Sequence, residues 1–201
     1  MDKVSYCLGM SIAQNLINSG VVDLNFDDFK NGVKTIYTND TPEVSPEEGN
    51  QVLEKFFAEV KRLVEENERK ERESNLKSSK EYLKKHSRED GVQTTKSGLQ
   101  YKVLVEGDGK QPGPHSRVKC HYRGWFVDGT EFDSSYKRGV PATFSLDQVI
   151  RGWAEGLQLM KAGSKYEFTI PFELGYGENG IPGHVPGNSV LNFIVELLDV
   201  E

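Results

Sequence analysis

The sequence predicts an α+β protein in which an all-helical region and a long connecting helix precede a domain built on an antiparallel β-sheet. Residues 4–64 carry apolar side chains at three- to four-residue spacing, and no proline or glycine interrupts residues 50–90, a pattern typical of helices. From Gly91 onward the composition shifts to β-branched and aromatic residues, with turn signals at intervals of about ten residues. We therefore expect a helical region over residues 1–90 and a sheet domain over residues 91–201.

Two short amphipathic helices are predicted at the start of the chain. The first covers residues 4–19 and is ended by Gly20. The second follows Asn25, whose side chain can cap it, and should bury Phe26, Phe29, Val33 and Ile36. The apolar residues of the first helix are Val4, Leu8, Ile12, Leu16 and Ile17.

A third, long helix is predicted to begin at Ser45 and to continue to about residue 90. Ser45 can act as N-cap, Pro46 suits the first helical position, and Glu48 completes a capping box. Beyond Glu65 the apolar stripe nearly vanishes among mixed charges, which favours a solvated helix supported by ion pairs between successive turns. A disordered linker over residues 65–90 is the alternative. The stripe before it contains Val52, Leu53, Phe56, Phe57, Val60, Leu63 and Val64.

The apolar stripes of residues 1–64 predict self-association. A helical segment of this size buries too little apolar surface to be stable alone. Packing against a second copy would cover the stripes, so we expect a homodimer formed through residues 1–64. A monomeric helical domain is the alternative.

Six strands and one short helix are predicted after Gly91. The helix, over residues 153–161, offers Trp153, Leu157 and Met160 to a concave antiparallel sheet. Asp128-Gly129 is predicted to form a two-residue type I′ hairpin turn, because both residues tolerate positive φ. The strands are expected at residues 99–105, 118–127, 131–133, 143–146, 166–171 and 190–200.

Composition excludes several classes of function. The net charge of −6 argues against nonspecific binding to nucleic acid or anionic membrane. No apolar run approaches the roughly 20 residues of a membrane span. Residues 1–10 lack a basic segment followed by an apolar core, and Cys7 and Cys120 fall in different predicted regions. We therefore expect a cytoplasmic protein without disulfides, and a periplasmic one if a signal peptide was removed.

Two motifs that resemble cofactor sites are rejected. Residues 175–180, G-Y-G-E-N-G, fit a nucleotide-binding pattern, but Pro182 and Pro186 follow where a helix would be needed. The four histidines have no metal-ligand spacing. We expect neither a cofactor nor a metal.

The candidate site lies in residues 118–133 and 149–153, which supply an aromatic and nearly uncharged set of side chains. Core packing alone could explain aromatic residues in a sheet, but this set also carries polar groups. The hydroxyls of Tyr122 and Tyr176 need partners when buried, and Asp133 needs a cation, for which Arg138 is the nearest candidate. Apolar walls with a few convergent polar groups are typical of a ligand pocket. The apolar members are Tyr122, Phe132, Val149, Ile150 and Trp153.

These stretches, with Tyr176-Gly177 and the closing run V-L-N-F-I-V-E-L-L, resemble the FKBP-type peptidyl-prolyl cis-trans isomerases over residues 92–201. Residues 1–90 resemble the N-terminal dimerisation region of the bacterial Mip-like, two-domain members. The resemblance implies an FKBP-like sheet wrapped on a short helix. It also implies a dimeric folding helper that acts on proline-containing peptides and partly folded proteins, and macrolide inhibitors as pocket ligands.

The resemblance also implies roles for individual residues. Trp153 would form the pocket floor, the Ile150 N–H would bond one substrate carbonyl, and the Tyr176 hydroxyl would bond another. The chain departs from many single-domain relatives at Ala142 and over residues 180–187, which bears on macrolide affinity and sequence preference. The implied catalytic residues are Tyr122, Phe132, Asp133 and Tyr176, and the implied substrate-binding residues are Arg138, Phe144, Val149, Ile150, Trp153, Ile181, Val185 and Phe193.

Proline isomerisation suits an apolar pocket because it requires neither a proton transfer nor a nucleophile. The barrier of about 18–20 kcal/mol comes from amide resonance. An apolar cavity can favour the twisted amide over the planar, dipolar amide that water stabilises. A non-catalytic chaperone or peptide-binding module on the same fold is the rival hypothesis. Such a module would be free to lose the aromatic set with Asp133, which this chain retains.

Overall fold

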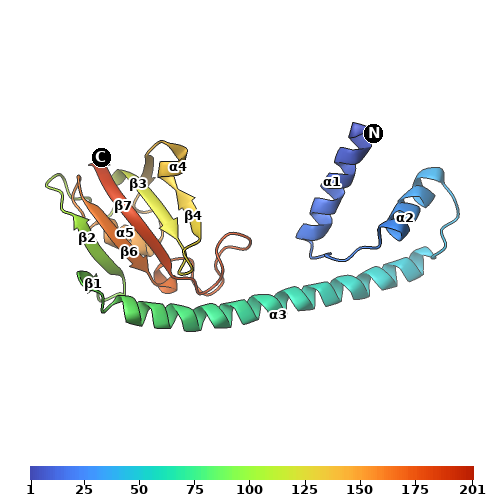
Figure 1. Ribbon diagram of the computed structural model, residues 1–201, viewed down its shortest axis with the longest axis horizontal. Helices are drawn as coiled ribbons and strands as arrows, with labels where there is room; N and C mark the ends of the chain where they lie inside the picture. Colours follow the sequence, from blue (N-terminus) through green and yellow to red (C-terminus); the bar gives the residue numbers. More distant parts are fainter. The chain divides into compact units, whose positions relative to one another are not determined.

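The computed structural model describes all 201 residues and divides them into two compact units, Met1–Arg69 and Lys70–Glu201 (Figure 1). The long helix α3 belongs to both units. The expected boundary after residue 90 follows the change in composition, whereas the contacts group the last turns of α3 with the C-terminal unit. No helix has the length and the apolar character needed to cross a membrane.

The N-terminal unit contains α1 (Lys3–Asn18), α2 (Phe26–Thr38) and the first part of α3 (Pro46–His86). The predicted helix starts are confirmed. The Asn25 side chain accepts hydrogen bonds from the amides of Asp27 and Asp28, and the Glu48 amide donates to Ser45 Oγ at 3.2 Å. These contacts satisfy amides that have no partner inside the helix.

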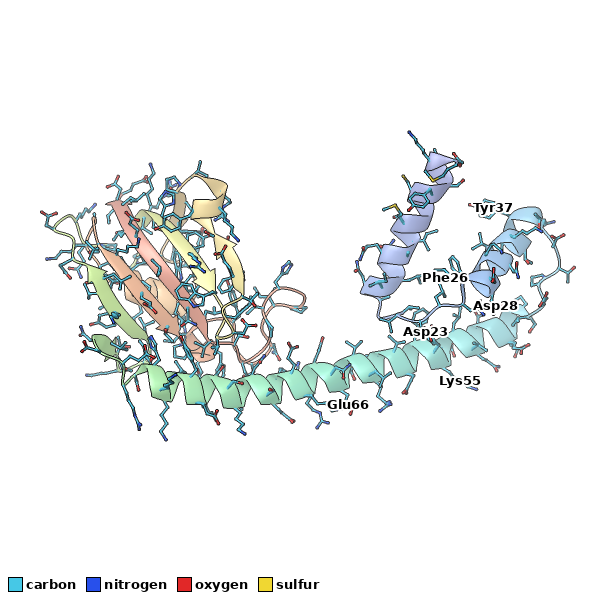
Figure 2. All side chains as sticks on the ribbon, in the orientation of Figure 1. Asp23, Phe26, Asp28, Tyr37, Lys55 and Glu66 are labelled. Carbon is cyan, nitrogen blue, oxygen red and sulfur yellow. The ribbon has the colours of Figure 1, made fainter.

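The apolar faces of the N-terminal helices are not covered within one chain. The burial expected for α2 is wrong for a single copy: Phe26 is 75% exposed, Ile36 73% and Val33 40%. Figure 2 shows Phe26 and Tyr37 standing out from α2. Neither α1 nor α2 contains a buried residue, so most of their apolar side chains remain exposed in one chain.

The C-terminal unit is an antiparallel sheet with the strand order β1-β2-β6-β7-β3-β4, and β5 pairs with β3. The short helix α5 (Arg151–Leu157) lies against it, which confirms the predicted α+β fold. Two glycines allow close approach: a Cβ on Gly152 or Gly156 would lie 2.4 Å from Ile170 or 2.7 Å from Phe168. The strands are β1 (Val92–Thr94), β2 (Gln100–Val105), β3 (Arg117–Trp125), β4 (Glu131–Ser134), β5 (Ala142–Ser145), β6 (Lys165–Ile170) and β7 (Leu191–Val200).

Several details of the C-terminal unit differ from expectation. Strand β1, helix α4 (Ser135–Arg138) and the 3₁₀ turn η1 (Phe172–Leu174) were not predicted. The type I′ turn is also wrong. The Gly129 amide donates to the Phe126 carbonyl, and of the two turn residues only Gly129, at φ 89°, is left-handed. The loop therefore spans three residues, and only its last position needs positive φ.

The end of α3 is not the fully solvated helix that its charge density predicts. The helix is continuous to His86, which makes the alternative of a disordered linker wrong. Ser79 is 3% exposed and His86 is 5% exposed, because one face of these turns packs on the sheet domain. A stripe of mostly polar side chains therefore docks α3 on the C-terminal unit.

Candidate active site

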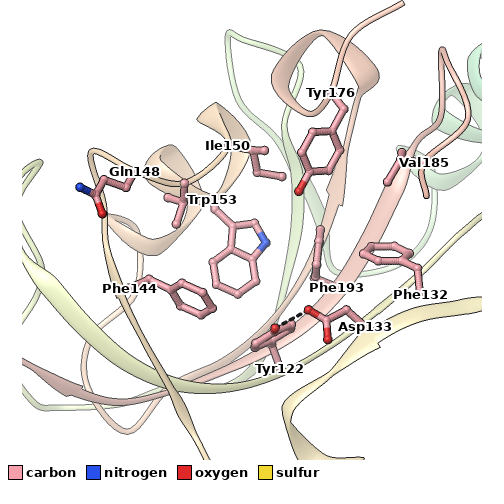
Figure 3. A pocket seen from close by; sticks show the side chains of 11 residues that line it. Tyr122, Phe132, Asp133, Phe144, Gln148, Ile150, Trp153, Tyr176, Val185 and Phe193 are labelled. Atoms are coloured by element: carbon pink, nitrogen blue, oxygen red, sulfur yellow. Dashed lines mark hydrogen bonds between the residues drawn. The ribbon is translucent and has the colours of Figure 1, made fainter. Parts of the chain in front are cut away.

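A cavity of about 320 Å³ opens between the sheet, the N-terminal end of α5 and the loop that follows η1 (Figure 3). Strands β3, β4, β5 and β7 each contribute at least one side chain. The cavity is lined by Tyr122, Phe132, Asp133, Phe144, Gln148, Val149, Ile150, Trp153, Tyr176, Val185 and Phe193.

Edge-to-face ring contacts fix the walls of the cavity around Trp153. The Trp153 ring lies 5.2 Å from Tyr122, 5.3 Å from Phe144 and 5.2 Å from Phe193, with interplanar angles of 80–88°. Phe132 meets Phe193 at 5.5 Å and 88°. Such geometries are favourable because the positive edge of one ring meets the negative face of the next. The walls are therefore preformed and apolar.

One charged network borders the cavity. Tyr122, from β3, donates its hydroxyl to Asp133, from β4, and Arg138 donates to the other carboxylate oxygen of Asp133. Arg138 Nη2 also donates to the Tyr122 hydroxyl at 2.6 Å. Helix α4, which the sequence did not reveal, places Arg138 within reach and ends at Gly139 in the left-handed conformation. The predicted pairing of Asp133 with Arg138 is present.

The network keeps Asp133 ionised and Tyr122 protonated. Burial by itself would raise the pKa of Asp133, but the hydrogen bonds from Tyr122 and Arg138 outweigh it and hold that pKa below its ordinary value. Burial and the bond to Asp133 raise the pKa of Tyr122 to about 12. At neutral pH the site therefore holds a paired carboxylate and no group poised to accept a proton.

Several hydrogen-bond donors at the cavity have no partner within the protein, and the buried indole N–H of Trp153 is one of them. Two others are the Ile150 N–H, which precedes α5, and the Tyr176 hydroxyl, which points into the cavity (Figure 3). Burial, and then the nearby charge of Asp133, raises the pKa of Tyr176, so its hydroxyl stays protonated. Both donors are free to meet carbonyl oxygens of a bound peptide.

Most residues expected at the site come together in this cavity. Arg138 and Ile181 are not among the lining residues: Arg138 reaches the cavity through Asp133, and Ile181 pairs with Val185 in the rim. Gln148 lines the cavity and was missed, although it directly precedes the predicted segment at Val149. A polar side chain at a rim leaves no periodic signal in a sequence.

Family models match both parts of the chain. The model described as "FKBP-type peptidyl-prolyl cis-trans isomerase" matches residues 108–198. The model described as "Domain amino terminal to FKBP-type peptidyl-prolyl isomerase" matches residues 1–103.

Curated relatives and a solved structure agree with these matches. FkpA of Aeromonas hydrophila is 47% identical over 79% of the chain, which spans only 59% of that relative. FkpA of Escherichia coli K12 is 40% identical over the whole chain, which spans 76% of that relative, and its crystal structure matches with a TM-score of 0.75 over 99% of this chain and 95% of that one. A Legionella longbeachae relative named "Outer membrane protein MIP" is 37% identical over the whole chain and 85% of its own length.

Proposed function

The chain belongs to the FKBP-type peptidyl-prolyl cis-trans isomerases, and from this premise we propose that the cavity around Trp153 is where X-Pro bonds rotate. The observation that carries this assignment is the preformed aromatic cavity bordered by the Tyr122–Asp133–Arg138 network. The site offers apolar walls and free hydrogen-bond donors, and its one carboxylate, Asp133, is already paired, which fits a rotation that requires no proton transfer.

Catalysis by this cavity rests on the difference between the planar and the twisted amide. The planar amide is dipolar and loses hydration on entering an apolar cavity, whereas the twisted amide has less dipole to lose. Each preference of about 1.4 kcal/mol for the twisted form raises the rate tenfold. A cavity lined by Trp153, Phe132 and Phe193 supplies that preference without any covalent step.

We assign roles to the lining residues on this basis. Trp153 forms the floor beneath the proline ring, and Tyr122, Phe132, Val149, Phe144 and Phe193 form the walls. The Ile150 N–H and the Tyr176 hydroxyl each hold one peptide carbonyl. Asp133, paired with Arg138, fixes the Tyr122 ring at the wall.

The test is a protease-coupled isomerisation assay on an X-Pro peptide with the full chain and the Asp133→Asn variant. The variant weakens the network, and we expect kcat/KM to fall about tenfold or more. Asp108→Asn is the matched control, because it removes the same charge from an exposed turn. Equal activity of the two variants would contradict the assignment of Asp133. A wild type no faster than the uncatalysed background would favour the peptide-binding module instead.

We propose that residues 1–64 form a homodimer. The apolar stripes of α1, α2 and α3 are exposed in one chain; Phe56 is 41% exposed and Leu53 53%. Light scattering after gel filtration should give about twice 22.6 kDa for the full chain. Phe56→Asp should give a monomer, whereas Lys55→Asp, which places a carboxylate on the same helix at an exposed polar position, should not. A monomeric wild type would overturn the proposal.

We propose that the substrates are proline-containing segments of unfolded or partly folded proteins. In a dimer, a chain bound in one cavity would meet the second cavity at a raised effective concentration. The dimer should therefore accelerate proline-limited refolding of a model protein more than the Phe56→Asp monomer does, at equal cavity concentration. The apolar cavity is also where we expect macrolide inhibitors to compete with peptide.

The comparisons do not confirm the cytoplasmic location expected from the sequence. A relative 37% identical over the whole chain is named an outer membrane protein, so we propose the cell envelope as the compartment. Fractionation of cells that carry the native protein should recover it with envelope markers. Recovery with cytoplasmic markers would favour the original expectation.

A further inference from the structure

The loop of residues 175–190, between η1 and β7, carries part of the cavity but has little structure of its own. Tyr176 and Val185 line the cavity from this loop. Its internal hydrogen bonds are a bridge between Ile181 and Val185, with N–H···O distances of 2.8 and 2.9 Å, and single bonds from His184 to Ile181, from Asn188 to Gly177 and from Ser189 to Pro186. The loop belongs to no helix or sheet, so contacts from outside it help to hold its conformation.

Those contacts come from the last turns of α3. The Asn75 side chain donates to the Gly187 carbonyl at 3.1 Å, and the buried Ser79 hydroxyl donates to the Asn188 carbonyl at 2.7 Å. In return, Asn188 Nδ2 donates to the Arg72 carbonyl at 3.0 Å. The helix and the loop are therefore joined by three hydrogen bonds between residues more than 100 positions apart.

Asn188 connects this junction to the cavity. It is held in the left-handed conformation, at φ 58°, which is unusual for a residue with a side chain. Its own N–H donates to the Gly177 carbonyl at 3.1 Å, directly after Tyr176. Contacts therefore run from Ser79 through Asn188 to the segment that presents the Tyr176 hydroxyl.

The docking face of α3 is a mostly polar stripe, in which only Leu76 and Leu83 are apolar and half-buried. Residues 75, 79, 82 and 86 recur at alternating four- and three-residue spacing. Tyr82 donates to Asn192 at 3.1 Å, and His86 meets Gln100 at 2.7 Å. Hydrogen bonds depend on distance and angle more steeply than apolar contacts do, so such a stripe fixes a geometry.

We propose that Asn75 and Ser79 are positioning residues for the isomerase cavity, which they affect by holding the loop of residues 175–190 on α3. The proposal rests on the proposed function of that cavity. The hydrogen bonds of the two side chains go to Gly187 and Asn188, which do not line the cavity. They fix Gly187 and Asn188, and through them the placement of Tyr176 and Val185.

The experiment compares the full chain with Asn75→Ala, Ser79→Ala and the double variant. Ser78→Ala is the matched control, because the neighbouring Ser78 hydroxyl is exposed and bonds only within its helix, to Ser74 at 2.7 Å. The first measurement is hydrogen exchange at the Ile181 and Val185 amides. The second is the separation of KM from kcat for an X-Pro peptide.

We expect each lost bond to speed loop exchange about fivefold, and the double variant to speed it about 25-fold. KM should rise severalfold while kcat changes less than twofold, because the loop alters binding and not the apolar floor. Exchange across β6 and β7 should stay unchanged. The Ser78→Ala variant should match the wild type in every measurement.

Two results would overturn the proposal. One is loop exchange in the double variant equal to that of Ser78→Ala. The other is faster exchange throughout the sheet together with a parallel fall in kcat, which would indicate a general loss of stability. If the wild type lacks isomerase activity, the proposed function fails, and the exchange measurement alone still decides whether α3 holds the loop.

Discussion

Gly124 offers a sharp test of how closely the cavity walls are packed. It lies on β3, opposite Asp133 of β4 and Phe193 of β7. A Cβ at this position would lie 2.7 Å from Phe132 Cζ, 2.8 Å from Phe132 Cε2 and 2.7 Å from Phe193 Cε1. The absence of a side chain at Gly124 is thus what allows the two rings to meet edge to face.

Gly124→Ala should therefore displace the cavity walls. Carbon atoms pack best at about 3.5–4.0 Å, so each ring must move by roughly 1 Å. Overpacking of this kind typically costs about 1–3 kcal/mol of unfolding free energy. A misplacement of about 1 Å at a site can cost up to 100-fold in rate, so we expect kcat/KM to fall about 10- to 100-fold.

The protease-coupled assay should be run at a temperature at which urea titration shows the variant fully folded. Gly113→Ala is the matched control, because its Cβ would find its nearest neighbour, Ser116 Oγ, at 3.9 Å. Neither glycine has positive φ, so backbone strain does not distinguish the two variants. If Gly124→Ala kept the activity of Gly113→Ala, the wall formed by Phe132 and Phe193 would not contribute to catalysis.

Two further predictions concern ionisation. Arg138→Ala should raise the pKa of Asp133, measured by carbon NMR titration of its carboxylate. Arg123→Ala, which removes one of the two cations paired with Glu131, should leave the pKa of Asp133 unchanged. Glu167, with Gln100 and Glu89, raises the pKa of His86 above 6.5 despite burial. Protonated His86 therefore stabilises the fold fully below pH 6.5, and this contribution is lost as the pH rises through the folded-state pKa. The urea midpoint of the wild type relative to His86→Gln should therefore fall as the pH rises above about 6.5, and an unchanged difference would contradict this.

The elements that the sequence predicted are those whose signal is local. Capping residues such as Asn25 and Ser45 act within three residues of themselves, and the strand pattern of β3 repeats every second residue. Most cavity residues could be assembled because six of them fall in residues 118–133 and 149–153, and because Phe144, Tyr176, Val185 and Phe193 are implied by the resemblance to a known family. Helix α4 could not be predicted, because four residues are too few to show helical periodicity. Its cap, Ser134, is also the last residue of strand β4.

The docked face of α3 shows why a buried polar interface cannot be predicted from the periodicity of a sequence. Asn75 and Ser79 lie among lysines and glutamates, where a polar residue is normally solvated, so periodicity assigns them to the surface. Their burial depends on carbonyls at Gly187 and Asn188, more than 100 residues later, which no local pattern encodes. An apolar stripe predicts burial because water disfavours it, whereas a polar stripe can bond either to water or to the protein, so its pattern does not predict which of the two it does.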